Sequence, residues 1–151
     1  MDYEVVNLEE KKVIGVTART KNSDADMPVI IGGLWNRFYQ EGIYSLITNK
    51  QNDKALGIYS DYSSDVNGEY SVTVACEVGN FDLIPTNAVI KVIPAGKYAK
   101  FIVHGHMQHA VADFWSKLWQ MDLDRSYTYD FEEYQDCSID NAEIHIYISM
   151  K

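Results

Sequence analysis

Alternating apolar and polar positions predict a chain rich in short β-strands. The clearest strand is Glu69–Val78, where every second residue from Tyr70 onward is apolar, as expected when successive side chains point to opposite faces. Further segments show shorter versions of the same pattern: Tyr3–Leu8, Val13–Thr20, Leu56–Tyr62, Val89–Ile93, Tyr98–Val103, Ser126–Tyr134 and Ala142–Ser149. The pattern therefore predicts antiparallel strands joined by short turns.

Two other segments repeat apolar residues with the period of an α-helix. Pro28–Gly42 carries an apolar stripe that includes Trp35, and Pro28 suits the first helical turn, where its missing N–H costs no hydrogen bond. Met107–Met121 carries a matching stripe that includes Trp115. Strands combined with these helices predict an α+β fold.

The order strand–helix–strand–strand occurs twice along the chain. The segments Leu34–Phe38 and Phe114–Leu118 place Trp35 and Trp115 at equivalent helical positions. We therefore predict one domain over residues 1–151, built from two pseudo-repeats over about residues 1–80 and 87–151. The expected architecture is an antiparallel sheet packed against two helices, with a ligand cleft where the halves meet.

The charge balance excludes some partners. Acidic residues outnumber basic ones by 22 to 13, which gives a formal net charge of −9. Because this charge repels phosphate backbones and no basic run offsets it, we expect no direct contact with nucleic acid. The same field would attract a small cation.

The chain shows no sign of export or of membrane insertion. Its first residues lack the basic start and apolar run of a signal peptide, and its longest apolar stretches fall short of the roughly 20 residues that span a bilayer. Cys76 and Cys137 do not form a spacing typical of disulfide or zinc frameworks. We predict a cytoplasmic protein without membrane contact.

A carboxylate among tyrosines is the strongest candidate for a ligand site. In Ser126–Tyr134, the strand period places Glu132 and Tyr134 on one face. Aromatic faces and a carboxylate suit a lipophilic cation, and a carboxylate walled by rings is expected to have a raised pKa. The simpler alternative is that the tyrosines favour strands and the acids face water. Trp35 and Trp115 could likewise be core residues or walls of a cage.

Motifs for metal binding and catalysis are weak. His104, His106 and His109 surround a strand-to-helix corner, but no carboxylate or cysteine with ligand-like spacing accompanies them. The sequence also lacks a GxSxG motif and a glycine-rich phosphate loop. We predict no metal site and no cofactor.

Several segments, in this order along the chain, resemble the GyrI-like effector-binding superfamily, which includes the ligand domains of AraC- and MerR-type multidrug regulators. Within it, the pattern is similar to the stand-alone, integron-associated type. The matching segments are Leu34–Gly42, Leu56–Tyr62, Gly68–Val74, Ile93–Ala99, Trp115 with Trp119, Asp130–Tyr134 and Ala142–Ile148. The histidines at 104, 106 and 109 depart from the family pattern and leave the rim of the cleft undefined.

This resemblance implies that Glu132 faces a cleft lined by Tyr134 and Trp35, with Tyr59 and Tyr70 beside them. It implies a stand-alone protein without its own DNA-binding domain that binds cationic aromatic xenobiotics, for sequestration or effector sensing. One alternative is a GyrI-like hydrolase in which Glu132 positions or deprotonates water. Another is a module that modulates a protein partner, and a homodimer also stays open.

Overall fold

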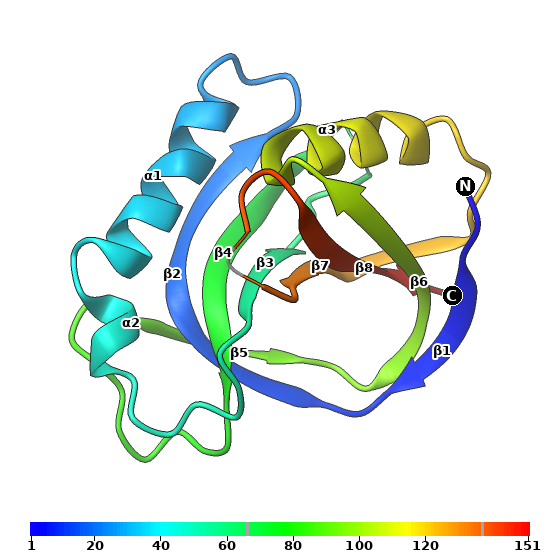
Figure 1. Cartoon of the computed structure of the whole chain (residues 1–151). Coiled ribbons are helices and arrows are strands. Elements are labelled where there is room, and N and C mark those ends of the chain that lie inside the picture. Colours follow the sequence, from blue (N-terminus) through cyan, green and yellow to red (C-terminus); the bar gives the residue numbers. More distant parts are fainter. Residues whose placement is uncertain (66, 137) are drawn as a thin grey trace.

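The computed structural model describes residues 1–65, 67–136 and 138–151, which form a curled antiparallel sheet flanked by helices (Figure 1). In chain order the elements are β1 (Glu4–Leu8), β2 (Lys11–Lys21), α1 (Met27–Tyr39), α2 (Ile43–Leu46), β3 (Ala55–Ser60), β4 (Glu69–Val78), β5 (Val89–Ile93), β6 (Gly96–Gly105), α3 (Met107–Leu118), β7 (Arg125–Tyr134) and β8 (Ala142–Met150). The predicted α+β fold is confirmed.

The sheet is arranged symmetrically about its middle. Over the described residues it has eight strands in the order β1-β6-β8-β7-β3-β4-β2-β5. Its halves meet where β3 pairs with β7, and each half then repeats one order outward, β3-β4-β2 on one side and β7-β8-β6 on the other. The units β2-α1-β3-β4 and β6-α3-β7-β8 are the predicted strand–helix–strand–strand repeats. On its outer side, β2 pairs with β5, and β6 pairs with β1.

Each long helix covers its own half of one sheet face. α1 buries Leu34 and Phe38 against β2 and β4, and α3 buries Phe114 and Leu118 against β6 and β8. The opposite face curls around a third cluster: Val13, Leu56, Ile58, Ala75, Ile93, Tyr98, Phe131 and Tyr147. Because each long helix packs against its own half of the sheet, the space above the β3–β7 seam between the helices can stay open.

The structure changes the predicted helix ends. The first helix ends at Tyr39, because Gly42 adopts a left-handed conformation with φ of +89° that interrupts the helical path. The short helix α2 follows it and was not predicted. The second long helix also ends early, at Leu118 instead of Met121.

Two further expectations concern membranes and cysteines. None of the helices in the described part of the chain is both long and apolar enough to cross a bilayer. Cys76 is a free thiol buried in the core under α1, and this burial raises its pKa to about 11. The expectation for Cys137 falls outside the described residues.

Candidate functional site

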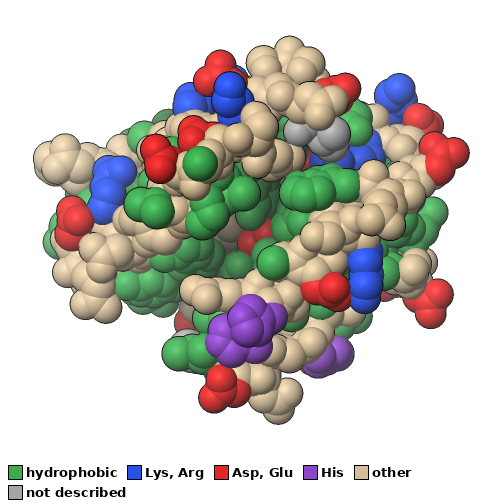
Figure 2. All heavy atoms as spheres, turned by 90° about the horizontal axis from the view of Figure 1, so that it is seen from above, with side chains coloured by type: hydrophobic (Ala, Val, Ile, Leu, Met, Phe, Trp, Pro, Cys, Tyr) green, Lys and Arg blue, Asp and Glu red, His purple; other side chains and the backbone are tan. Residues whose placement is uncertain are grey.

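A cavity of about 930 Å³ lies over the seam between the two halves. Residues of both long helices, of β3, β4 and β7, and of the connecting loops line it. Figure 2, which looks down on the molecule from above, shows the hollow edged by hydrophobic side chains. The cavity therefore occupies the place where the sequence predicts a ligand cleft.

The helices give the cavity its tryptophan walls. In α1 the residue after buried Leu34 is Trp35, and in α3 the residue after buried Phe114 is Trp115. Each tryptophan is half-buried, because one residue along the helix is about a quarter of a turn, which places it beside the core residue and toward the seam. Both predicted tryptophans thus line the cavity from equivalent helical positions.

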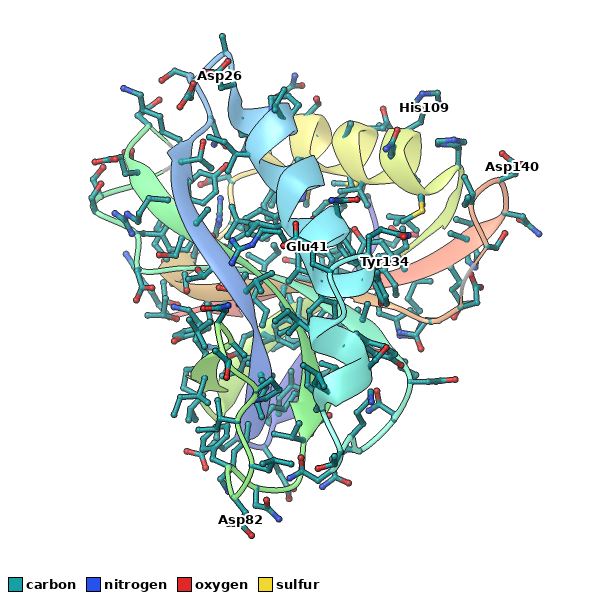
Figure 3. The ribbon with its side chains drawn as sticks, turned by 90° about the vertical axis from the view of Figure 1, so that its left-hand side faces the viewer. Asp26, Glu41, Asp82, His109, Tyr134 and Asp140 are labelled. Atoms are coloured by element: carbon teal, nitrogen blue, oxygen red, sulfur yellow. The ribbon has the colours of Figure 1, made fainter. Side chains whose placement is uncertain are left out.

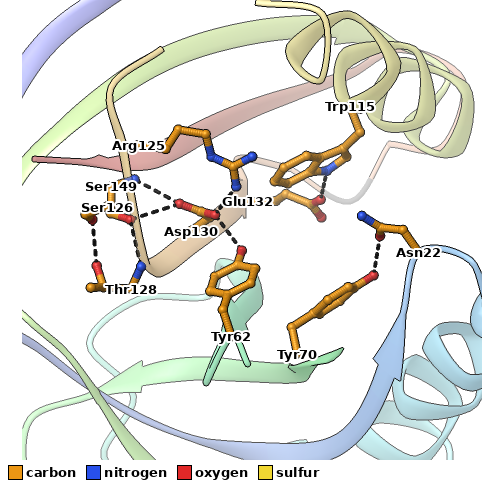
Figure 4. A network of polar contacts seen from close by, with 10 residues as sticks. All are labelled: Asn22, Tyr62, Tyr70, Trp115, Arg125, Ser126, Thr128, Asp130, Glu132 and Ser149. Carbon is orange, nitrogen blue, oxygen red and sulfur yellow. Dashed lines mark hydrogen bonds and ion pairs between the residues drawn. The ribbon is translucent and has the colours of Figure 1, made fainter. Parts of the chain in front are cut away.

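Glu132 of β7 is the buried acid of the cavity. Only 2% of its surface is exposed. Trp115 Nε1 and the Tyr59 hydroxyl each donate to Oε2 at 2.8 Å, and the Tyr134 hydroxyl donates to Oε1 at 2.7 Å. Figure 4 shows the bond from Trp115 reaching down from α3 to the carboxylate. The acid is therefore held in one orientation by three aromatic donors.

A glycine on the neighbouring strand leaves room for this acid. Gly57 of β3 pairs with Glu132 in the sheet, and a Cβ at Gly57 would lie 3.0 Å from Glu132 Oε1 and 3.8 Å from the Trp35 ring. Such a contact is tighter than ordinary van der Waals packing. The absence of a side chain at Gly57 therefore helps to set the depth of the cavity floor.

Burial and hydrogen bonding act in opposite directions on Glu132. Desolvation raises its pKa above the usual 4.5, while the bonds from Trp115, Tyr134 and Tyr59 oppose this shift. The pKa values of Tyr59 and Tyr134 are raised well above 10.0, first by burial and then by the charge of Glu132. Both phenols therefore remain protonated donors to the carboxylate. The predicted rise in the pKa of Glu132 is confirmed in direction.

The aromatic rings around Glu132 contact one another in two groups. Trp35 meets Tyr134 edge-on with centroids 5.1 Å apart, Trp115 meets Tyr59 at 5.1 Å, and Tyr59 meets Tyr70 at 5.8 Å. These contacts fix the ring planes without filling the cavity. The structure thus brings together all the predicted site residues: Glu132, Tyr134, Trp35, Tyr59, Tyr70 and Trp115. Their contact with a ligand stays a prediction.

A second buried acid lies two residues along the same strand. Asp130 is fully buried and receives a 2.7 Å bond from Arg125 Nη2. Tyr62 donates to the same oxygen of Asp130, and Ser149 donates to the other oxygen through its backbone N–H and its hydroxyl (Figure 4). The strand period places Asp130 on the face of Glu132, but the sequence analysis identified neither Asp130 nor Arg125 as a site residue.

Two more acidic residues belong to the lining of the cavity. Asp53 precedes β3, and Asp136 follows β7, and both line the cavity. Among the described lining residues, Arg125 is the one with a basic side chain, and Asp130 pairs with it. The described lining therefore holds more acidic than basic side chains.

The histidines of the strand-to-helix corner do not gather into one site. The rings of His106 and His109 are tilted against each other with centroids 4.4 Å apart, whereas His104 faces Glu143, with Nε2 and Oε1 3.3 Å apart. Figure 3 shows His109 on the outer side of α3, away from Tyr134. Within the described ranges, no group of three His, Cys, Asp or Glu side chains could hold a metal ion. These histidines are also absent from the lining of the cavity.

Known proteins share this fold over its full length. The chain is 27% identical to YobU of Bacillus subtilis (strain 168), provisionally named a transcriptional regulator protein, over 97% of this chain and 96% of that protein. It is similar to the integron cassette protein VCH_CASS2 from the mobile metagenome of Vibrio cholerae, with a TM-score of 0.81, 28% identity, and coverage of 99% and 95% of the two chains.

A further solved structure, that of SAV2435 bound to tetraphenylphosphonium, has a TM-score of 0.79 and 22% identity over 100% of this chain and 94% of that one. The model of the integron-associated effector-binding protein family matches residues 4–150. This match includes the three described helices, the described sheet, and Glu132 with the aromatic residues that surround it. The chain therefore belongs to the integron-associated effector-binding protein family.

Proposed function

We propose that this protein binds lipophilic cations with aromatic groups in the cavity over the β3–β7 seam, and so sequesters them or reports their presence to a partner. The observation that carries this proposal is Glu132, a carboxylate that is 2% exposed and walled by aromatic rings. The membership of an effector-binding family supports a small-molecule ligand.

The physical argument concerns the cost of burying a charge. A carboxylate in a low-dielectric site is costly to ionise without a counter-charge, and the raised pKa of Glu132 records that cost. A bound cation would supply the counter-charge, and the faces of Trp35, Tyr134 and Tyr59 would add cation–π attraction. A neutral or anionic ligand of the same shape would gain only the apolar contacts.

The similarity to SAV2435 agrees with this choice of ligand. That protein has the same fold and is known with tetraphenylphosphonium bound, which is a lipophilic cation with aromatic rings. A cavity of about 930 Å³ falls within the range of ligand sites for molecules of drug size, about 300–1,000 Å³.

The direct test compares ions of one shape and opposite charge. Calorimetry with tetraphenylphosphonium and tetraphenylborate holds size and apolar area nearly constant while reversing the sign of the charge. We expect binding of the cation and much weaker binding of the anion. Equal binding of both ions would reject Glu132 as the basis of selectivity.

A second experiment separates binding from catalysis. A receptor returns its ligand unchanged, whereas a hydrolase that uses Glu132 to activate water would consume a hydrolysable ligand. Chromatography of a cationic aromatic ester, such as acetoxyphenyl-triphenylphosphonium, after incubation with the protein should recover the intact ester. Conversion of the ester by the wild-type protein, lost in Glu132→Gln, would support the hydrolase alternative.

A further inference from the structure

The guanidinium of Arg125 is more than the partner of Asp130. Arg125 is 7% exposed and lines the same cavity as Glu132. Its Nη2 donates to Asp130 Oδ2 at 2.7 Å, while its buried Nε has no hydrogen-bond partner among the described residues. The guanidinium also packs over the Tyr127 ring, with Cζ 4.3 Å from the ring centroid, but this contact covers a face and uses none of its five N–H donors. A buried donor without a partner is costly unless something else meets it.

The surroundings of Arg125 define what it could meet. Asp130 balances its charge and is itself held by Tyr62 and Ser149, so the ion pair is already complete. The pair therefore adds no net positive charge to a cavity in which Glu132 is the other buried acid. A neutral acceptor, such as a carbonyl or ether oxygen, fits these donors better than an anion does.

The ion pair of Arg125 and Asp130 lies near Glu132, because Asp130 and Glu132 are close together on β7. Asp130 and Glu132 are two residues apart on one face of the strand, which is about 7 Å at the usual rise per residue. Figure 4 shows Asp130 bridging Arg125 and Tyr62 beside the carboxylate of Glu132. Because Arg125 and Glu132 line the same cavity, a ligand held at Glu132 would reach Arg125 with a side arm.

We infer that Arg125 is a second ligand-contacting residue of this cavity, which donates hydrogen bonds to a neutral acceptor on the side arm of a ligand whose cationic centre lies at Glu132. This inference rests on the proposed binding of cations at Glu132. It narrows the ligand class to lipophilic cations that carry a carbonyl or ether group, and it assigns Arg125 a role in specificity.

The test uses two cations that differ at one carbon, pentyltriphenylphosphonium and 4-oxopentyltriphenylphosphonium. In Arg125→Met alone, Asp130 would be left buried and unpaired, which threatens folding. The double variant Arg125→Met/Asp130→Asn removes both charges, and the asparagine can still accept from Ser149. We expect the double variant to weaken binding of the ketone about ten-fold or more, and that of the pentyl cation about two-fold at most.

Arg37→Met is the matched control, because Arg37 lies on α1 outside the cavity lining. It should leave the ratio of the two affinities unchanged. An equal loss for both cations in the double variant overturns the role of Arg125 and leaves the cation site intact. If neither cation binds the wild-type protein, the proposed function itself fails.

A crystal structure of the wild-type protein with the ketone decides the question even if the double variant does not fold. A carbonyl oxygen within hydrogen-bonding distance of the Arg125 guanidinium supports the inference. A carbonyl oxygen that lies beyond hydrogen-bonding distance of the Arg125 guanidinium overturns it.

Discussion

Replacing Glu132 with glutamine would remove the buried negative charge of the cavity with little change in shape. Trp115 Nε1 can only donate, so the amide oxygen of the glutamine must take the position of Oε2, where it accepts from Trp115 and Tyr59. The amide nitrogen then faces Tyr134, whose hydroxyl can rotate to accept. The variant should therefore fold with the cage intact.

The expected loss of affinity follows from the charge alone. A cation whose centre lies about 6 Å from the carboxylate gains about 2–3 kcal/mol at an effective dielectric constant of about 20. This energy corresponds to about 30- to 150-fold in affinity. Tetraphenylphosphonium should lose binding by this factor in Glu132→Gln, and a neutral ligand such as triphenylphosphine oxide should change much less.

Calorimetry on both ligands measures the effect, and Glu133→Gln is the control. Glu133 is the next residue of β7, points to the other face and lies 3.9 Å from Lys54 through Oε1, away from the cavity lining. The control should bind both ligands like the wild type. Our reasoning is refuted if Glu132→Gln weakens the cation and the neutral ligand equally, because the carboxylate would then act through structure and not through charge.

Further predictions concern pH, the cage wall, the cavity floor and the core. Because the pKa of Glu132 is raised in the folded protein, folding favours its protonated form. The stabilisation from Glu132 should be complete below the unfolded pKa, close to 4.5, and should be lost as pH rises through the folded pKa. In thermal melts of the empty protein across this range, the melting temperature should fall more steeply with pH for wild type than for Glu132→Gln. Cation binding should favour the ionised form and release protons where the empty site is partly protonated, which calorimetry in buffers of different ionisation enthalpy detects; an uptake of protons would contradict this. Tyr134→Ala deletes the ring that meets Trp35, so cationic and neutral ligands should both bind more weakly, whereas Tyr134→Phe should keep most of the binding of the neutral ligand. Gly57→Ala places a methyl group 3.0 Å from Glu132 Oε1 and should weaken cation binding while the protein remains folded by circular dichroism; unchanged affinity would show that the cavity floor can adjust. Phe114→Ala, under α3, should lower the free energy of unfolding by about 3–5 kcal/mol in a denaturant titration, because Phe114 is almost fully buried.

The strands and the long helices were open to prediction because they depend on local patterns. Glu69–Val78 alternates strictly, and the structure forms β4 over the same residues. The helix ends were less predictable, because Gly42 can occur within a helix or interrupt one, and its left-handed conformation depends on how α2 packs. The short helix α2 has only four residues, too few to show a period.

The sequence by itself determined the repeat, the acidic character and the face of β7 that carries Glu132, since period and charge are properties of the chain. Only the tertiary structure decided that Tyr59 and Trp115, 73 and 17 residues away from Glu132, donate to its carboxylate. It also decided that Arg125 enters the cavity, because a register shift between Arg125 and Asp130 interrupts the alternation of β7, so that counting by two cannot place Arg125. Such contacts depend on how the two halves meet at β3 and β7, and no local pattern in the sequence specifies which residues of one half lie beside those of the other.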